Sequence, residues 1–147
     1  MKTVSSRLLL LDVNVLLALA WPNHQLHAAA LRELQVRRGR WATCALTQLG
    51  FIRLSSNPAA IPTAKGPAEA AALLEAMVAD PLHVYLESLP SPVAKDCRGA
   101  FGGIMASRQV TDAYLLLLAR RNHAIFVTFD TRLEGLADSE TRIRILP

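Results

Sequence analysis

Short apolar runs that each end at an aspartate constrain the fold of this chain most strongly. Residues 8–11 (LLLL) end at Asp12, and residues 124–129 (AIFVTF) end at Asp130. Continuous apolar runs of this length are typical of strands that are buried on both faces. Segments with helical patterns lie between them. The sequence therefore predicts an α/β fold with a mostly parallel central sheet flanked by helices.

The other elements follow from breaker residues and apolar periodicity. Further strands are expected over residues 41–44, 83–86 and 142–146, the last at a sheet edge because basic and apolar residues alternate there. Helices are expected over residues 13–20, 24–38, 47–56, 68–79 and 112–121, with Asn23, Thr47 and Thr111 starting the second, third and fifth. In the second of these helices, Glu33 is expected to face water. Residues 90–108 are expected to be mostly loop.

Composition favours one compact domain over residues 1–147. Of these residues, 52% are hydrophobic and 19% are charged, which suits a well-filled core. The longest apolar stretch contains Asp12 and Asn14, so we expect neither a membrane span nor a signal peptide, and therefore a cytoplasmic protein. Cys44 and Cys97 have no metal-ligand spacing and are expected to be free thiols in a reducing compartment.

The charge distribution indicates a partner class without naming the partner. The chain has a net charge of +4, and its arginines cluster within residues 32–40, 120–121 and 142–144. Solvated helix ends and strand edges would explain each arginine taken alone. As a set, the arginines favour a nucleic acid or an acidic peptide, and they do not choose between the two.

Three aspartates are expected at one edge of the sheet. Asp12 and Asp130 each follow a strand directly, and ligands of parallel sheets bind beyond the carboxyl ends of the strands. Asp112 begins a helix in which Leu115 and Leu116 share its side, so its carboxylate is expected to face inward. Turn residues and a helix-dipole charge would explain each aspartate singly. Together they favour a common ligand, because an inward carboxylate is costly unless it is paired or bound to metal.

Converging carboxylates of this kind predict a hard divalent cation. Mg²⁺ prefers oxygen ligands and is usually held by one or two carboxylates, with water and substrate phosphates completing its shell. Such an ion lowers the pKa of an attacking water and offsets charge on a phosphodiester. A basic rim would admit the polyanionic substrate. We therefore expect Mg²⁺, with Mn²⁺ as a possible substitute.

Four motifs occur in an order that resembles a known family. LLLLDVNVLLALA, TQLGFIRL, QVTDAYLLLLA and IFVTFDTRL resemble the motif series of PIN domains, and of VapC-type toxins in particular, over about residues 8–146. The resemblance implies an endoribonuclease of a type II toxin–antitoxin module. It also implies an RNA substrate, a cognate antitoxin whose tail occupies the active-site groove, and a homodimer with no membrane association.

The resemblance also implies site residues. By matching position, it makes Asp12, Asp112 and Asp130 the catalytic, metal-binding carboxylates, with Asn14 and Thr128 orienting them. Nothing in the sequence identifies the residues that bind nucleic acid.

One position departs from the family pattern. The family places a glutamate in the helix that carries Thr47, and this chain has Gln48 and Gly50 there. Gln48 can offer a neutral amide oxygen to a metal ion, but it brings no negative charge. Glu134 lies close to Asp130 in sequence and could compensate, although a solvent-facing side chain is the plainer expectation.

Two other functions remain open from the sequence. A phosphatase with an aspartate nucleophile needs a second aspartate two residues later, where this chain has Asn14, and a suitable lysine downstream. A PIN-like domain that binds RNA or a protein without cleavage is the main alternative, because the family glutamate is missing. We expect Trp21, Trp41 and Phe51 in the core, and no catalytic role for any of the four histidines.

Overall fold

The computed structural model describes residues 7–37, 39–104, 106–136 and 142–147, and its centre is a parallel sheet. The strand order is β3-β2-β1-β4-β5, and every neighbouring pair is parallel. The strands are β1 (Leu9–Leu11), β2 (Trp41–Cys44), β3 (His83–Leu86), β4 (Ile125–Thr128) and β5 (Arg142–Ile145). The expected fold class, the strands and the edge position of the last strand are confirmed.

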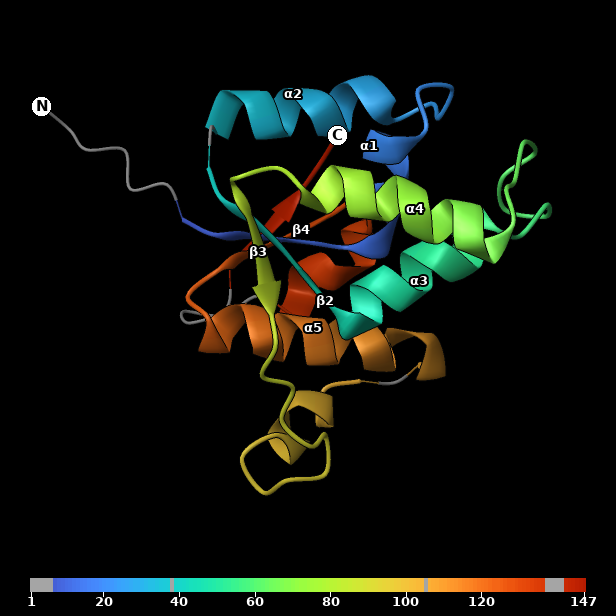
Figure 1. Ribbon diagram of the computed structural model, residues 1–147. Coiled ribbons are helices and arrows are strands. Elements are labelled where there is room, and N and C mark those ends of the chain that lie inside the picture. The colour runs from blue at the N-terminus through green and yellow to red at the C-terminus, as the bar shows by residue number, and fades with distance from the viewer. Residues whose placement is uncertain (1–6, 38, 105, 137–141) are drawn as a thin grey trace, which may run out of the picture.

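Helices cover both faces of the sheet (Figure 1). One face carries α1 (Val13–Ala20), α2 (His27–Arg37), α3 (Ala45–Ser55) and α4 (Pro67–Val78), and the other carries α5 (Val110–Arg121). Short 3₁₀ helices η1 (Arg98–Phe101), η2 (Ser107–Gln109) and η3 (Thr131–Leu136) flank α5 in sequence.

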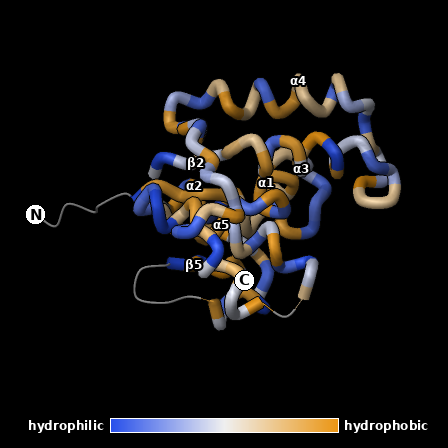
Figure 2. Tube along the Cα trace, turned by 90° about the horizontal axis from the view of Figure 1, so that it is seen from below, coloured by the Kyte–Doolittle hydropathy of each residue, from blue (hydrophilic) through white to orange (hydrophobic). Residues whose placement is uncertain are grey.

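The two faces of the sheet bury separate apolar clusters because side chains alternate along each strand. Leu9, Leu11 and Trp41 pack with α1–α4, and Leu10 and Phe126 pack with α5. The buried aromatic side chains include Trp21, Trp41 and Phe51, as expected. Apolar and polar segments follow one another along α4 in Figure 2, and its buried residues Ala70 and Leu74 lie one turn apart on the same side of the helix.

Several helix ends differ from the sequence-based expectation. Helix α2 begins at His27 and not at His24, because residues 22–26 form turns in which the His24 ring accepts a hydrogen bond from the Leu26 N–H (3.1 Å). Helix α3 begins two residues before Thr47, whose hydroxyl accepts from the Cys44 N–H at 3.0 Å. Helix α5 begins at Val110, so Thr111 lies inside it. Residue 38, the expected end of the helix that begins near His24, lies outside the described residues.

Glu33 was wrongly expected to face water. It is 9% exposed, and its carboxylate accepts a hydrogen bond from Nε of Arg144 at 3.2 Å. The contact links α2 to the edge strand β5. A local helical pattern gives no sign of it, because the partner lies 111 residues further along the chain.

Gly50 allows α3 to approach α1 closely. A Cβ atom at this position would lie 2.8 Å from Cγ2 and 3.4 Å from Cγ1 of Val13. Valine has few χ1 rotamers in a helix, and rotation would bring another methyl group into the same space. Val13 follows Asp12 directly, so this contact supports the start of α1 at the end of β1.

Replacing Gly50 with alanine is therefore expected to destabilise the protein by about 1–2 kcal/mol. Overpacking costs about 1–3 kcal/mol, and the better helix propensity of alanine returns up to about 1 kcal/mol. Urea denaturation measures the change. Gly99→Ala is the control, because nothing lies within 4 Å of its added Cβ. The double variant Gly50→Ala, Val13→Ala should regain stability relative to Gly50→Ala; equal stability of Gly50→Ala and wild type would contradict the close contact.

Candidate active site

The connectivity of the sheet creates a topological switch point at the carboxyl ends of β1 and β4. The chain passes from β1 to β2 and β3 through helices on one face, then returns through α5 on the other face to β4. The direction of strand succession therefore reverses between β1 and β4, the place where parallel sheets bind ligands. Asp12 follows β1, and Asp130 follows β4 after one intervening residue.

Asp12 is a buried carboxylate held by two hydrogen bonds. It is 6% exposed, and its Oδ1 accepts from the Val13 N–H at 2.7 Å. Its Oδ2 accepts from the Thr128 hydroxyl, also at 2.7 Å. Burial raises the pKa of Asp12, the two hydrogen bonds oppose that rise, and the negative charge of Asp130 adds to it. The side chain is thus fixed in position while its ionised form remains costly.

Asp112 lies in the first turn of α5 and is half-buried. Burial, followed by the negative charges of Asp12 and Asp130, raises its pKa from 3.8 to about 6. The expected inward orientation is supported, since Leu115 and Leu116 on the same helix are buried. The structure therefore places Asp112 close enough to Asp12 and Asp130 for their negative charges to raise its pKa.

Asp130 has a different environment. Its carboxylate accepts from Nε of Arg132 at 2.9 Å and from Nη2 at 2.8 Å, and it also accepts from the Arg132 backbone N–H at 3.0 Å. This pairing lowers the pKa of Asp130, and Arg108 contributes in the same direction. Thr128 connects the Asp12 carboxylate to the Asp130 backbone, since its hydroxyl donates to Asp12 and accepts from the Asp130 N–H at 3.1 Å.

The donor set suits a divalent cation without forming a closed cage. Within the described residues, no three acidic, histidine or cysteine side chains are close enough to ligate one metal ion together. A caged site is not required for Mg²⁺, which usually takes one or two carboxylates and completes its shell with water and phosphate. Asp12 and Asp112 are two close carboxylates whose ionisation is opposed in the metal-free protein, and a cation would relieve that opposition.

The other expected site residues are not brought to the carboxylates. Asn14 is exposed on the first turn of α1. Nε2 of Gln48 donates to the Thr43 hydroxyl at 3.0 Å, and that hydroxyl lies 2.7 Å from Nε2 of His83. Thr43 and Trp41 lie on the same face of β2, the opposite face of the sheet from Asp12. Glu134 is exposed.

Sequence reasoning missed Arg132 and Arg108 at the site. Neither arginine was assigned a role, because the arginine clusters noted in the sequence lie within residues 32–40, 120–121 and 142–144. The pattern Asp-x-Arg at residues 130–132 was the available signal, because a side chain two residues further on reaches back readily across a turn. These two arginines supply a basic rim beside the acidic centre.

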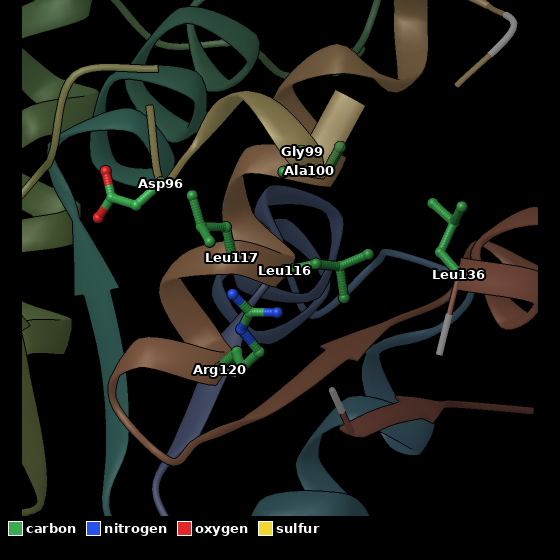
Figure 3. Close-up of a pocket in the computed structure, with 8 residues that line it drawn as sticks. Asp96, Gly99, Ala100, Leu116, Leu117, Arg120 and Leu136 are labelled. Atoms are coloured by element: carbon green, nitrogen blue, oxygen red, sulfur yellow. The ribbon is translucent and has the colours of Figure 1, made fainter. Parts of the chain in front are cut away.

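In the described part of the chain, depressions along α5 lie away from the aspartates. An apolar groove of about 360 Å³ is lined by residues that include Leu46, Leu89, Phe101, Val110 and Tyr114. A separate cavity of about 370 Å³ lies along the helix towards its C-terminal end. In Figure 3, Arg120 extends along α5 towards Leu116 and Leu117, with Asp96 and Leu136 on opposite sides. None of the three aspartates lines either depression.

Comparison with known proteins identifies the family. A family model described as PIN domain matches residues 9–139. Ribonuclease VapC38 of Mycobacterium tuberculosis is 44% identical over 135 residues, which cover 90% of this chain and 92% of that protein. Ribonuclease VapC39 of the same species is 41% identical over 131 residues, covering 88% and 91%. This chain belongs to the VapC family of PIN-domain proteins.

The fold of this VapC-family chain is also found in a solved structure. One chain of VapBC2 from Rickettsia felis, crystallised with a DNA fragment from the promoter, matches with a TM-score of 0.65 at 9% identity. The match covers 95% of this chain and 99% of that chain. The family resemblance expected from the four motifs is confirmed. Among the described residues, no helix is both long and apolar enough to cross a membrane.

Replacing Asp112 with asparagine is expected to raise the melting temperature of the metal-free protein at pH 7 and to change it little at pH 4. The folded-state pKa of Asp112 is about 6, above its ordinary value of 3.8. Its contribution to stability is therefore present below pH 3.8 and is lost as the pH rises through 6. At pH 7 the wild-type protein retains an unfavourable ionised carboxylate, which asparagine removes.

Thermal melts in EDTA at the two pH values measure this effect. Asp96→Asn is the matched control, because hydrogen bonding to Arg121 lowers the pKa of Asp96 and its removal should not stabilise the protein at pH 7. A melting temperature of Asp112→Asn that does not exceed the wild-type value at pH 7 would show that Asp112 is less buried, or lies further from the other carboxylates, than in this structure.

Proposed function

We propose that this chain is the ribonuclease toxin of a type II toxin–antitoxin module, an endoribonuclease that hydrolyses RNA with the aid of Mg²⁺ or Mn²⁺. VapC ribonucleases of the PIN-domain class generally depend on a divalent metal ion. The observation that carries the proposal is the pair formed by Asp12 and Asp112, whose pKa values are both raised by burial and by neighbouring negative charge.

We assign metal binding to Asp12 and Asp112, with Asp130 as the third carboxylate. The Val13 N–H and the Thr128 hydroxyl each take one lone pair of Asp12 and leave others for a cation. Asp112 ionises near pH 6 in the metal-free protein, and a bound cation would favour its charged form. A bound Mg²⁺ would supply a water of lowered pKa and would offset negative charge on the phosphodiester.

The remaining residues of the site position the carboxylates and the substrate. Thr128 is fully buried and holds the Asp12 side chain and the Asp130 backbone in one register. Arg108 and Arg132 give the rim a positive charge that can attract a phosphate chain. The arrangement of charges at the ends of β1 and β4 is therefore suited to an extended polyanion over an acidic centre.

A PIN-like domain that binds RNA without cleaving it is less well supported. That alternative rests on Gln48, whose amide is occupied by Thr43 on the other face of the sheet. The loss of a carboxylate at this position leaves the pair of Asp12 and Asp112 intact.

We also propose a cytoplasmic homodimer that is held inactive by a cognate antitoxin. Exposed apolar side chains that line the apolar groove along α5 support a protein partner: Leu46 is 37% exposed and Val110 is 45% exposed. Exposed apolar residues that gather beside a groove are typical of protein interfaces. The relatives named VapC and the VapBC crystal structure support an antitoxin as one such partner.

Asp12→Asn is expected to reduce RNA cleavage by roughly 100-fold or more, because a neutral amide removes charge from the metal site while keeping its shape. The assay is cleavage of total RNA by the purified protein in Mg²⁺, with EDTA as a second way to stop it. Asp96→Asn is the control, since Asp96 is paired with Arg121 and lies outside the site. Cleavage by Asp12→Asn at the wild-type rate would mean that the active site is elsewhere.

Expression of the chain alone is expected to arrest growth of a bacterial host. Expression of Asp12→Asn to the same level should not, because arrest depends on RNA cleavage. Growth curves with immunoblots for protein level provide the measurement. Normal growth with abundant wild-type protein that cleaves RNA in vitro would reject the toxin role and retain the nuclease activity.

A further inference from the structure

Arg132 occupies both oxygens of a carboxylate in the active site. Nε and Nη2 of Arg132 form a fork on the two oxygens of Asp130, at 2.9 Å and 2.8 Å. Such a two-point pairing is the strongest geometry available to a guanidinium and a carboxylate. The negative charge of Asp112 also acts on Arg132. The guanidinium therefore neutralises part of the negative charge of the three aspartates. Without it, a metal ion would have to neutralise that charge.

The exposure of the two partners is unequal. The Asp130 side chain is 16% exposed, whereas the Arg132 side chain is 54% exposed. The carboxylate is fixed at the end of β4 by the contact of its own backbone with Thr128, and Arg132 extends into solvent at the rim. Water can hydrate the exposed guanidinium once the fork opens, which lowers the free-energy cost of separating the pair, so Arg132 can leave Asp130 when a competing cation arrives.

We propose that Arg132 serves two ligands in turn, Asp130 in the metal-free protein and a phosphate of the RNA once a divalent cation is bound. This inference rests on the proposed function. A guanidinium binds a phosphate with the same fork that it presents to a carboxylate. A bound cation would neutralise the carboxylates in place of Arg132. The guanidinium could then pair with a phosphodiester of an RNA bound beside it. Arg132 is thus a substrate-binding residue that is also a competitor of the metal.

Competition predicts tighter metal binding when the fork is removed. Arg132→Gln is expected to bind Mn²⁺ about threefold more tightly than wild type in a calorimetric titration of the metal-free protein, because no ion pair needs to be broken. Arg108→Gln is the matched control: it removes a positive charge that acts on Asp130 without a hydrogen bond. The gain must be larger for Arg132→Gln than for Arg108→Gln, since charge alone would affect both. Arg132→Lys keeps the charge but loses the fork, and it should fall between wild type and Arg132→Gln.

RNA binding supplies the second readout. Binding of a fluorescent RNA oligonucleotide is measured over a range of salt concentrations in EDTA and in Ca²⁺, with the RNA checked on a gel after each titration. The slope of log Kd against log salt should increase by about 0.7 in Ca²⁺ for the wild type, the value of one further phosphate contact on a single strand. Arg132→Gln should lose this increase, whereas Arg108→Gln and Arg132→Lys should keep it.

The outcomes separate this inference from the proposed function. Equal Mn²⁺ affinities of Arg132→Gln and Arg108→Gln, or a salt slope that still increases in Ca²⁺ in Arg132→Gln, would overturn the role of Arg132 while wild-type cleavage of RNA still stands. A wild-type protein that binds no Mn²⁺ and cleaves no RNA would reject both. Melts in EDTA check that each variant is folded, and all four forms are expected to melt cooperatively, because both arginines are exposed.

Discussion

The burial of the Asp12 carboxylate is the constraint on which the rest of the site depends. A negative charge that is 6% exposed at the centre of the sheet is tolerated only because the Thr128 hydroxyl and the Val13 N–H both point at it. Those donors come from the end of the neighbouring strand and from the start of the following helix. The sheet order, the register of β1 with β4 and the start of α1 are therefore all needed to position one side chain.

Three chemically identical carboxylates acquire different properties from this arrangement. Asp12 is stabilised by hydrogen bonds but penalised by burial, Asp112 has a pKa of about 6, and Asp130 is kept ionised by Arg132. In the metal-free site, the negative charges of the aspartates therefore repel one another. Binding of a cation would lower this repulsion, so the fold as well as the ligands would contribute to metal affinity. A site built for stability alone would replace at least one of these carboxylates.

The features that were predictable from sequence are those that depend on local pattern. Apolar runs ending at Asp12 and Asp130 indicated parallel strands and their shared edge, and helical periodicity indicated the inward side of Asp112. Long-range partners could not be predicted in this way. Glu33 has the spacing of a surface residue, yet Arg144 from the edge strand pairs with it. The fork of Arg132 on Asp130 is local in sequence, but whether an arginine pairs with a carboxylate or faces solvent also depends on how far that carboxylate is buried, which no short pattern shows.

The position of Gln48 shows how side-chain alternation in a strand limits what a missing glutamate means. Along β2, Ala42 and Cys44 pack on the face of α5, and Trp41 and Thr43 lie on the face of α1–α4. Because Gln48 donates to Thr43, its amide is held on the face away from Asp12. A glutamate in this rotamer could not donate that hydrogen bond, and it would have to accept one from Thr43 or leave the contact. The neutral amide at this position therefore leaves the hydrogen bonds of Asp12 and the charges that act on Asp112 unchanged.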